Sequence, residues 1–148
     1  MKKYDICIVG AGPGGIFSAY ELSKLNPKIK VSIIEQGSSL EKRKCPIDGK
    51  KITKCIGCKN CAIMNGFGGA GAFSDGKYNI TNEFGGDLYA YVGKKEAIDL
   101  MNYVDEINLA YGGQNTRKFT TANSDLKREC LQHDLHLLDA SVRHLGTD

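Results

Sequence analysis

Three glycines near the N-terminus have the spacing of a phosphate-binding turn. The stretch Gly10-Ala11-Gly12-Pro13-Gly14-Gly15 contains the pattern Gly-x-Gly-x-x-Gly. In such a turn the first glycine permits a tight bend, the second lets the backbone approach phosphate without a Cβ in the way, and the third lets a helix pack closely on a strand. The free amides and the positive dipole end of that helix stabilise anionic charge. The pattern predicts a site for the pyrophosphate of a dinucleotide.

An acidic residue follows at the distance that the ribose of a dinucleotide requires. Glu35 comes twenty residues after Gly15 and directly after a β-branched run. A carboxylate there can accept hydrogen bonds from the adenosine ribose hydroxyls of FAD or NAD. Its charge would repel a 2′-phosphate, which argues against NADP at this site. A solvated glutamate at the end of a core strand is the alternative interpretation.

A strand, a helix and a second strand are expected to position these residues. The β-branched run at 5–9 predicts the first strand, with Cys7 as a small buried residue in it. Apolar residues then recur at helical spacing over 16–20, and Asn26-Pro27 ends the helix. Residues 31–34 predict a second strand parallel to the first. The expected fold class is α/β, a Rossmann-like βαβ dinucleotide-binding domain with a parallel sheet.

Four cysteines form a candidate metal site. Cys55, Cys58 and Cys61 have iron–sulfur spacing, because two-residue intervals let consecutive thiolates surround one cluster. Asn65 stands where a bacterial ferredoxin run would place the next cysteine, so the fourth ligand would be Cys45, which is followed by proline. These thiolates could hold a [4Fe–4S] cluster or a structural zinc ion. A redox-active dithiol and four reduced cysteines without a ligand are the alternatives.

A second glycine-rich stretch follows the cysteines. Residues 65–77 contain five glycines among thirteen residues, which excludes a stable helix or a central strand. The backbone amides of such a stretch remain available to a closely approaching ligand. A plain flexible loop is the alternative, but the interleaved Phe67 and Phe73 favour a packed one. The stretch is the last part of a long Cys/Gly-rich excursion at about 37–78, which has no clear helical or strand periodicity. Because so long a loop within a compact domain usually has a role, a function is expected for it.

Composition excludes several classes of protein. The chain has 148 residues, 41% hydrophobic and 25% charged, which is typical of one modest globular domain. The net charge of +3 is small and the lysine clusters lack interleaved aromatic residues, so no nucleic-acid surface is predicted. No apolar run approaches the roughly 20 residues of a membrane helix, and no signal segment opens the chain. A single cytoplasmic domain, 1–148, that binds neither nucleic acid nor membrane is the expectation.

The remaining patterns predict elements without chemistry. Apolar residues at helical spacing predict helices over 94–111 and 124–133, and 135–138 predicts a further strand of the sheet. The three histidines do not share a metal-ligand spacing with a carboxylate on one face.

The glycine-rich stretches and the cysteine loop resemble known flavoproteins. The first segment is similar to the FAD-binding Rossmann fold of glutathione-reductase-like flavoproteins. Cys45-Pro46, the cysteine triplet and Gly66–Lys77 resemble the family of uncharacterised FAD-dependent dehydrogenases. The resemblance spans nearly the whole chain and continues, more thinly, in 103–105 and 143–148. It implies an FAD-dependent oxidoreductase.

The resemblance also implies which residues contact FAD. Those assigned to the pyrophosphate are Gly10, Gly12, Gly14 and Gly15. Glu35 holds the adenosine ribose, and Arg43 lines the adenine or phosphate side. Those assigned to the flavin side are Gly68, Gly69 and Gly71.

Members of this family are longer, with a substrate or cap domain. The chain is therefore expected to be the N-terminal part of a flavoprotein, incomplete at the C-terminus, with NAD(P)H as a possible electron donor of the full-length protein. No residue is assigned to catalysis, and the substrate or electron carrier is unspecified. The alternatives are an iron–sulfur or zinc module for electron transfer or structure, an NAD(H)-binding enzyme without flavin, and an inactive truncated fragment.

Overall fold

The protein folds into two compact units, Met1–Ser74 and Asp75–Asp148. The computed structural model describes residues 3–146, so Thr147 and Asp148, at the end of the stretch 143–148, lie outside the described residues. The expectation of a single domain stays a prediction.

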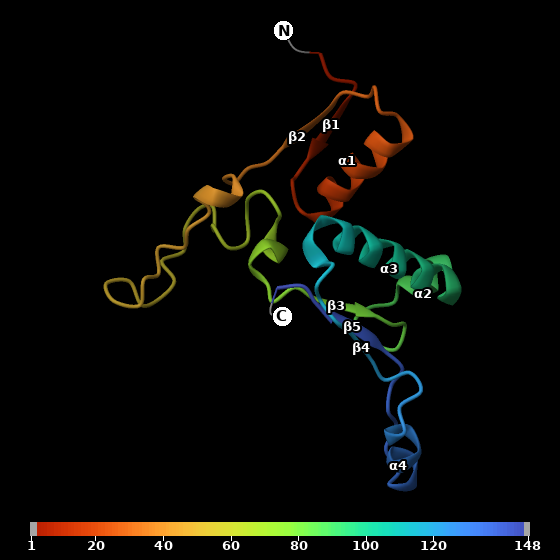
Figure 1. Ribbon diagram of the computed structural model, residues 1–148. Coiled ribbons are helices and arrows are strands. Elements are labelled where there is room, and N and C mark those ends of the chain that lie inside the picture. Colours follow the sequence, from red (N-terminus) through yellow and green to blue (C-terminus); the bar gives the residue numbers. More distant parts are fainter. Residues whose placement is uncertain (1–2, 147–148) are drawn as a thin grey trace. The chain divides into compact units, whose positions relative to one another are not determined.

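Unit 1 opens with the expected strand, helix and strand. These elements are β1 (Ile6–Val9), α1 (Pro13–Leu25) and β2 (Val31–Ile34). The strands are parallel, with Ile6 opposite Val31 and Val9 opposite Ile34, and α1 runs beside them (Figure 1). The βαβ unit is therefore confirmed, although the first strand starts one residue later than predicted. Asp5 lies before it, and its carboxylate accepts a hydrogen bond of 2.9 Å from the Lys30 amide.

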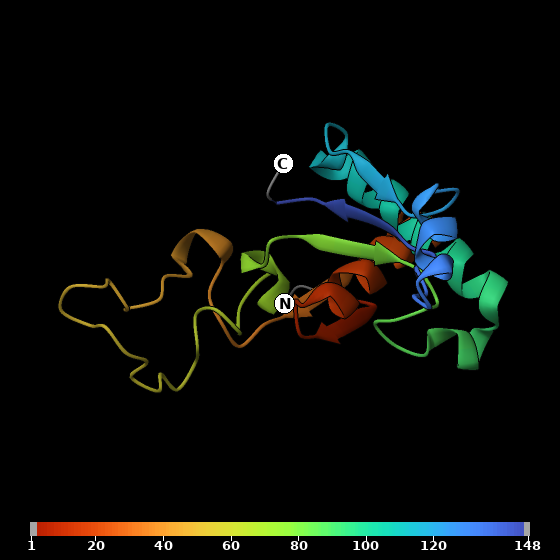
Figure 2. The ribbon, with the colours of Figure 1, turned by 90° about the horizontal axis from the view of Figure 1, so that it is seen from below.

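The excursion after β2 is an extended loop, visible in orange to yellow in Figures 1 and 2. Two short 3-10 helices, Leu40–Lys42 and Ala70–Phe73, flank it, and no helix or strand occurs among the described residues between them. One carboxylate orders part of the loop, because Asp48 Oδ1 accepts hydrogen bonds from the amides of residues 50, 51 and 52. The predicted lack of periodicity is confirmed.

Unit 2 contains a three-stranded sheet with the order β3-β5-β4, in which both pairs are antiparallel. The strands are β3 (Lys77–Ile80), β4 (Lys118–Thr120) and β5 (Ser141–His144). The helices are α2 (Leu88–Val92), α3 (Lys94–Asn108) and α4 (Leu126–Gln132), and a π-type turn, Leu109–Gly113, follows α3. The predicted helices near 94–111 and 124–133 are confirmed.

Two sequence expectations about the sheet were wrong. The parallel sheet does not extend into unit 2, where all described strands pair antiparallel. Residues 135–138 form no strand, and Leu135 is 60% exposed. The strand begins instead at Ser141, and its buried residue is Arg143 rather than an apolar side chain. An apolar pattern therefore pointed to the wrong segment. The structure establishes a mixed α/β fold.

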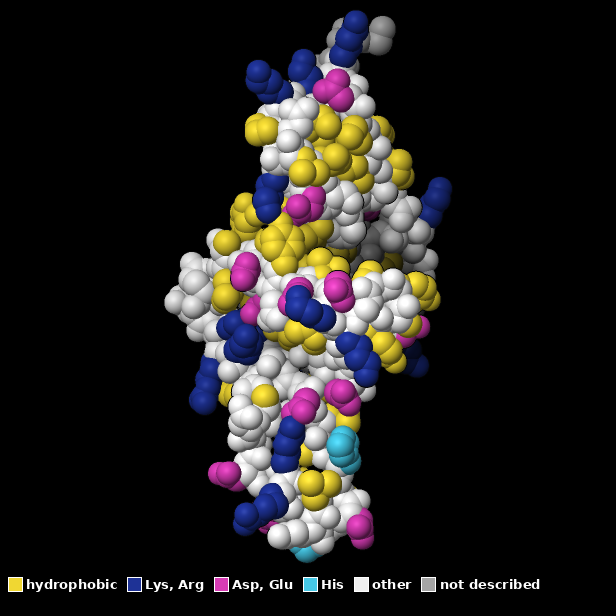
Figure 3. Space-filling model, turned by 90° about the vertical axis from the view of Figure 1, so that its right-hand side faces the viewer, with side chains coloured by type: hydrophobic (Ala, Val, Ile, Leu, Met, Phe, Trp, Pro, Cys, Tyr) yellow, Lys and Arg dark blue, Asp and Glu magenta, His cyan; other side chains and the backbone are white. Residues whose placement is uncertain are grey.

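Few apolar side chains are buried among the described residues: Ala11, Ile80 and Ala97. Cys7, expected to be buried, is exposed, and Val9 in the same strand is 85% exposed. The reason is that α1 covers only one face of the two-stranded sheet, whereas parallel sheets are usually covered on both faces. Figure 3 shows hydrophobic side chains gathered at the surface of unit 1. Within the range 3–146, no helix combines the length and the apolar character needed to cross a membrane.

Candidate functional site

The turn between β1 and α1 has the geometry expected from its glycines. Gly10 adopts φ +101°, which side chains rarely tolerate, and its amide donates a 2.7 Å hydrogen bond to the Ile34 carbonyl. A Cβ on Gly15 would lie 2.0 Å from the Gly10 oxygen and 3.3 Å from the Ile8 side chain. The first glycine therefore makes the bend, and the third lets α1 approach β1 closely.

The start of α1 is open to an anion. The first helical hydrogen bond runs from the Ile16 amide to the Gly12 carbonyl at 3.0 Å. Gly12 is the N-cap, and within the described chain no side chain caps the helix. A Cβ on Gly12 or Gly14 would meet no atom within 4 Å. The 13-residue helix thus begins without a side-chain cap, and open space borders the Cβ positions of Gly12 and Gly14, which is the arrangement that a phosphate at a helix start needs.

The second glycine-rich stretch lies against the first. The Gly68 amide donates a 2.8 Å hydrogen bond to the carbonyl of Ala11, which is fully buried. Gly69 has φ +63°, and a Cβ on it would lie 3.1 Å from the Gly12 Cα. Gly71 borders open space. Two stretches that the sequence separated by more than fifty residues therefore meet at the start of α1.

Glu35 links the two stretches through its carboxylate. Its Oε2 accepts a 2.8 Å hydrogen bond from the Ala11 amide, and its Oε1 accepts bonds from the amides of Gly37 at 2.9 Å and Gly66 at 3.0 Å. These bonds, that from Ala11 foremost, lower the pKa of Glu35. The carboxylate is therefore ionised at neutral pH. Its contact with a ribose stays a prediction, and its observed partners are backbone amides.

The ionisation of Glu35 predicts a pH dependence of stability. A carboxylate whose pKa is lower in the folded state stabilises the fold above its unfolded pKa of about 4.3, and this contribution is lost as the pH falls through the folded pKa. We expect Glu35→Gln to be less stable than the wild type at pH 7, with the difference shrinking below about pH 4. Denaturant unfolding of both proteins between pH 7 and pH 2 measures this difference in the free energy of unfolding.

Glu21→Gln is the matched control, because Glu21 lies on α1 and pairs with Lys24 at 3.9 Å across exposed surface. The free energy of unfolding of Glu21→Gln should differ little from that of the wild type at every pH. Equal pH profiles for Glu35→Gln and the wild type would contradict the prediction.

Arg43 is buried, with 4% of its surface exposed, and donates to four carbonyl oxygens. Nε and Nη2 donate to Ala62 at 2.8 Å and Ile63 at 2.6 Å. Nη1 donates to Phe67 at 2.7 Å and Gly69 at 2.8 Å. The guanidinium also lies 4.7 Å from the centre of the ring of Phe73, at cation–π distance. Arg43 therefore contacts the second glycine-rich stretch, while its contact with adenine or phosphate stays a prediction.

The four cysteines predicted as metal ligands lie along the loop. Cys45, Cys55 and Cys58 are exposed and Cys61 is half-buried, all as free thiols. Across residues 3–146 no three His, Cys, Asp or Glu side chains lie close enough to hold a metal ion. Amide hydrogen bonds, that from Met64 foremost, and the charge of Arg43 lower the pKa of Cys61. A metal or redox role for these cysteines stays a prediction.

Two glycines at the candidate site were not among the assigned contact residues, although Gly66 belongs to the predicted glycine-rich stretch 65–77. A Cβ on Gly37 would lie 2.5 Å from the Gly66 nitrogen, and one on Gly66 would lie 2.6 Å from Cδ of Arg43. Gly66 also has φ +120°. Both glycines therefore allow the end of β2 to touch the second glycine-rich stretch. Gly66 was signalled by the composition of the stretch 65–77, whereas Gly37 had no signal beyond its position two residues after the acid, which is no motif by itself.

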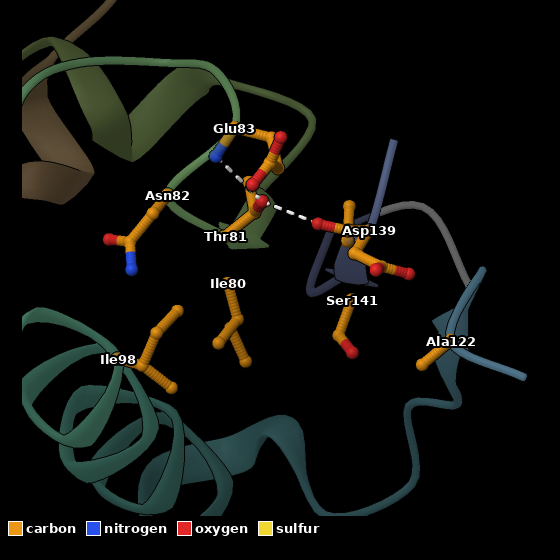
Figure 4. A pocket seen from close by; sticks show the side chains of 9 residues that line it. Ile80, Thr81, Asn82, Glu83, Ile98, Ala122, Asp139 and Ser141 are labelled. Atoms are coloured by element: carbon orange, nitrogen blue, oxygen red, sulfur yellow. Dashed lines mark hydrogen bonds between the residues drawn. The ribbon is translucent and has the colours of Figure 1, made fainter. Parts of the chain in front are cut away.

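Unit 2 has a cavity of about 250 Å³ beside β3 and β5 (Figure 4). Thr81 forms part of its wall. Its hydroxyl donates a 2.6 Å hydrogen bond to the Asp139 carbonyl and accepts a 3.0 Å hydrogen bond from the Glu83 amide. Ile80, Ile98 and Ser141 also line it. None of the predicted site residues takes part, so the candidate site lies in unit 1.

Comparisons with known proteins give short local similarities. No family model matches the chain, and no solved structure matches it significantly. It is 47% identical over 45 residues to an uncharacterized protein of Methanosarcina barkeri, covering 30% of this chain and 11% of that protein. It is 60% identical over 35 residues to thiamine thiazole synthase 4, chloroplastic, of Physcomitrium patens, covering 24% of this chain and 10% of that protein. Thiamine thiazole synthase 3, chloroplastic, of the same moss is 57% identical over 35 residues. The chain thus spans about a tenth of the length of these curated relatives.

Proposed function

We propose that this chain is the dinucleotide-binding portion of an FAD-dependent oxidoreductase, a dehydrogenase. The observation that carries the proposal is the meeting of two glycine-rich stretches at the start of α1, joined by the bond from Gly68 to Ala11. We call the surface formed by residues 10–15 and 68–71 the cradle. Glycine backbone beside a helix start suits a closely approaching ligand with anionic groups. The local similarity to thiamine thiazole synthases supports a relation to an enzyme without specifying the reaction.

The residues of the cradle fit a pyrophosphate. Gly12 and Gly14 border open space, and the uncapped amides of α1 would donate to the phosphate oxygens. The ionised carboxylate of Glu35 disfavours a ligand with a 2′-phosphate next to it. FAD therefore suits the site better than NADP.

When bound, a flavin supplies the hydride or electron chemistry, and the protein binds and orients it. In this proposal the α1 amides bind the pyrophosphate, while Gly68, Gly69 and Gly71 approach the flavin side with their backbone. NAD(P)H would serve as electron donor in the full-length protein. A small-molecule substrate or electron carrier, a cytoplasmic location and the absence of nucleic-acid and membrane partners complete the proposal.

Gly12→Ala separates ligand binding from folding. A Cβ at Gly12 meets no protein atom within 4 Å, and its φ of −76° suits alanine, so the free energy of unfolding should fall by no more than about 1 kcal/mol, the cost of alanine at an N-cap. The same Cβ would project into the space assigned to the phosphate. We expect affinity for FAD, measured by titration of flavin fluorescence, to fall at least about tenfold, or 1.4 kcal/mol.

Ser23→Ala is the control, because Ser23 lies near the other end of α1, about three turns from Gly12, and its hydroxyl donates to the Tyr20 carbonyl. It should bind FAD as the wild type does. A wild-type chain that binds no FAD, or a Gly12→Ala variant that binds it unchanged, would overturn the proposal. Protein purified without air should be yellow, whereas stoichiometric iron or zinc without flavin would favour a metal module.

A further inference from the structure

We infer that Arg43 is a positioning residue, which holds the second glycine-rich stretch against the turn between β1 and α1 and so assembles the dinucleotide site. This inference rests on the proposed function for its effect on ligand affinity. It assigns Arg43 a role that needs no contact with the ligand.

The carbonyl partners of Arg43 come from two successive parts of the loop. Ala62 and Ile63 directly follow Cys61, at the end of the cysteine-rich segment. Phe67 and Gly69 belong to the second glycine-rich stretch. One planar guanidinium therefore fixes the position of 62–63 relative to 67–69, which a flexible ammonium with three donors could not reproduce.

The segment that Arg43 holds carries the contacts to the first turn. Gly68 lies between the two carbonyls bound by Nη1, and its amide donates to the Ala11 carbonyl at 2.8 Å. A Cβ on Gly69 would lie 3.1 Å from the Gly12 Cα and 3.2 Å from Cδ of Pro13, so the Gly69 backbone approaches the first turn closely here. Loss of the guanidinium would release the carbonyls on both sides of the Gly68 amide.

The environment of Arg43 favours a structural rather than a ligand-binding position. Its surface is 4% exposed, one face of the guanidinium is covered by Phe73, and the identified bonds engage all three of its nitrogens. A buried charge held by several hydrogen bonds is costly to leave unpaired. The charge therefore stabilises one conformation of the loop, and the cysteine-rich segment is coupled to the cradle through it.

Amide hydrogen exchange of the ligand-free full chain, followed by NMR, tests the inference. In Arg43→Lys we expect the Gly68 amide to exchange at least about tenfold faster than in the wild type, because the variant loses charged hydrogen bonds to the carbonyls on both sides of this amide. The Gly10 amide, bonded to Ile34 within the βαβ unit, should keep its rate. Affinity for FAD should fall about tenfold as well.

Arg117→Lys is the matched control, since Arg117 is exposed and also lies over an aromatic ring, that of Phe119, at 5.0 Å. Arg117→Lys should change neither the exchange rate of the Gly68 amide nor the affinity for FAD. Should Arg43→Lys fail to fold, Phe73→Leu removes the ring beneath the guanidinium and keeps the arginine, and a smaller acceleration at Gly68 is expected.

The outcomes separate the two proposals. An unchanged Gly68 rate in the variants overturns the positioning role, and a loss of affinity with an unchanged rate assigns Arg43 to direct ligand contact instead. Faster exchange at Gly68 in Arg43→Lys, in a chain that never binds FAD, supports the positioning role of Arg43 and refutes the proposed function.

Discussion

Gly15→Ala is expected to destabilise unit 1 by about 3 kcal/mol or to prevent its folding. The added Cβ would lie 2.0 Å from the Gly10 carbonyl oxygen and 3.1 Å from its carbon. Both atoms belong to the backbone of a turn already held by the 2.7 Å bond from Gly10 to Ile34, so they cannot give way as a side-chain end would. Overpacking of this kind costs about 1–3 kcal/mol even where side chains can adjust.

Gly14→Ala is the control for this prediction, because Gly14 is also helical and its Cβ would meet no atom within 4 Å. Alanine has the higher helix propensity, so this variant should be as stable as the wild type or up to about 1 kcal/mol more stable. Denaturant unfolding of both variants measures the difference. Equal stability of the two would show that α1 does not pack on β1 as closely as described.

The sequence predicted the βαβ unit well because its determinants are local. The glycine spacing, the helical period of α1 and the β-branched run of β2 each depend on neighbouring residues. The antiparallel sheet of unit 2 depends on pairing between Lys77–Ile80 and Ser141–His144, which no local pattern encodes. The buried residue of its central strand is an arginine, so this strand has no apolar pattern. The apolar residues 135–138 therefore resembled a strand more closely than the true strand did.

The candidate site was predicted in its parts but not in its connections. Spacing identified the first glycine turn and Glu35, and composition identified the second glycine stretch. That Glu35 accepts bonds from both Ala11 and Gly66 depends on the path of the intervening loop. The same path turns Arg43 inward toward Phe67 and Gly69. Long-range backbone contacts of this kind follow from tertiary structure, which the sequence pattern alone does not contain.

Replacing Arg143 by methionine should destabilise unit 2 by about 3–5 kcal/mol, because it breaks a buried ion pair and leaves Asp105 uncompensated. Nε and Nη2 of Arg143 donate to the two carboxylate oxygens of Asp105 at 2.8 and 2.9 Å, and Nη1 donates to the Thr116 carbonyl. The side chains of the pair are only 7% and 6% exposed. The pair joins α3 to the central strand, so its loss removes one of the buried links between helix and sheet and leaves a carboxylate buried without its partner.

Lys95→Ala is the contrasting variant, since the pair from Lys95 to Asp99 lies along α3 with side chains 83% and 60% exposed. Thermal unfolding should show little change for it, because water screens exposed pairs. If Arg143→Met unfolded at the same temperature as Lys95→Ala, the buried pair would not be a determinant of this unit.

Tyr78 offers a spectroscopic check of the same pair. Its hydroxyl donates a 2.9 Å hydrogen bond to the Met101 carbonyl. Burial, together with the charge of Asp105, raises the pKa of Tyr78 to about 12. Asp105→Asn removes that negative charge, so Tyr78, followed by its own ring signals in an NMR titration, should ionise at lower pH than in the wild type. Because burial is the larger cause, the pKa should fall only part of the way to its ordinary value near 10. An unchanged titration of Tyr78 in Asp105→Asn would show that the Asp105 charge does not raise this pKa and that burial alone does.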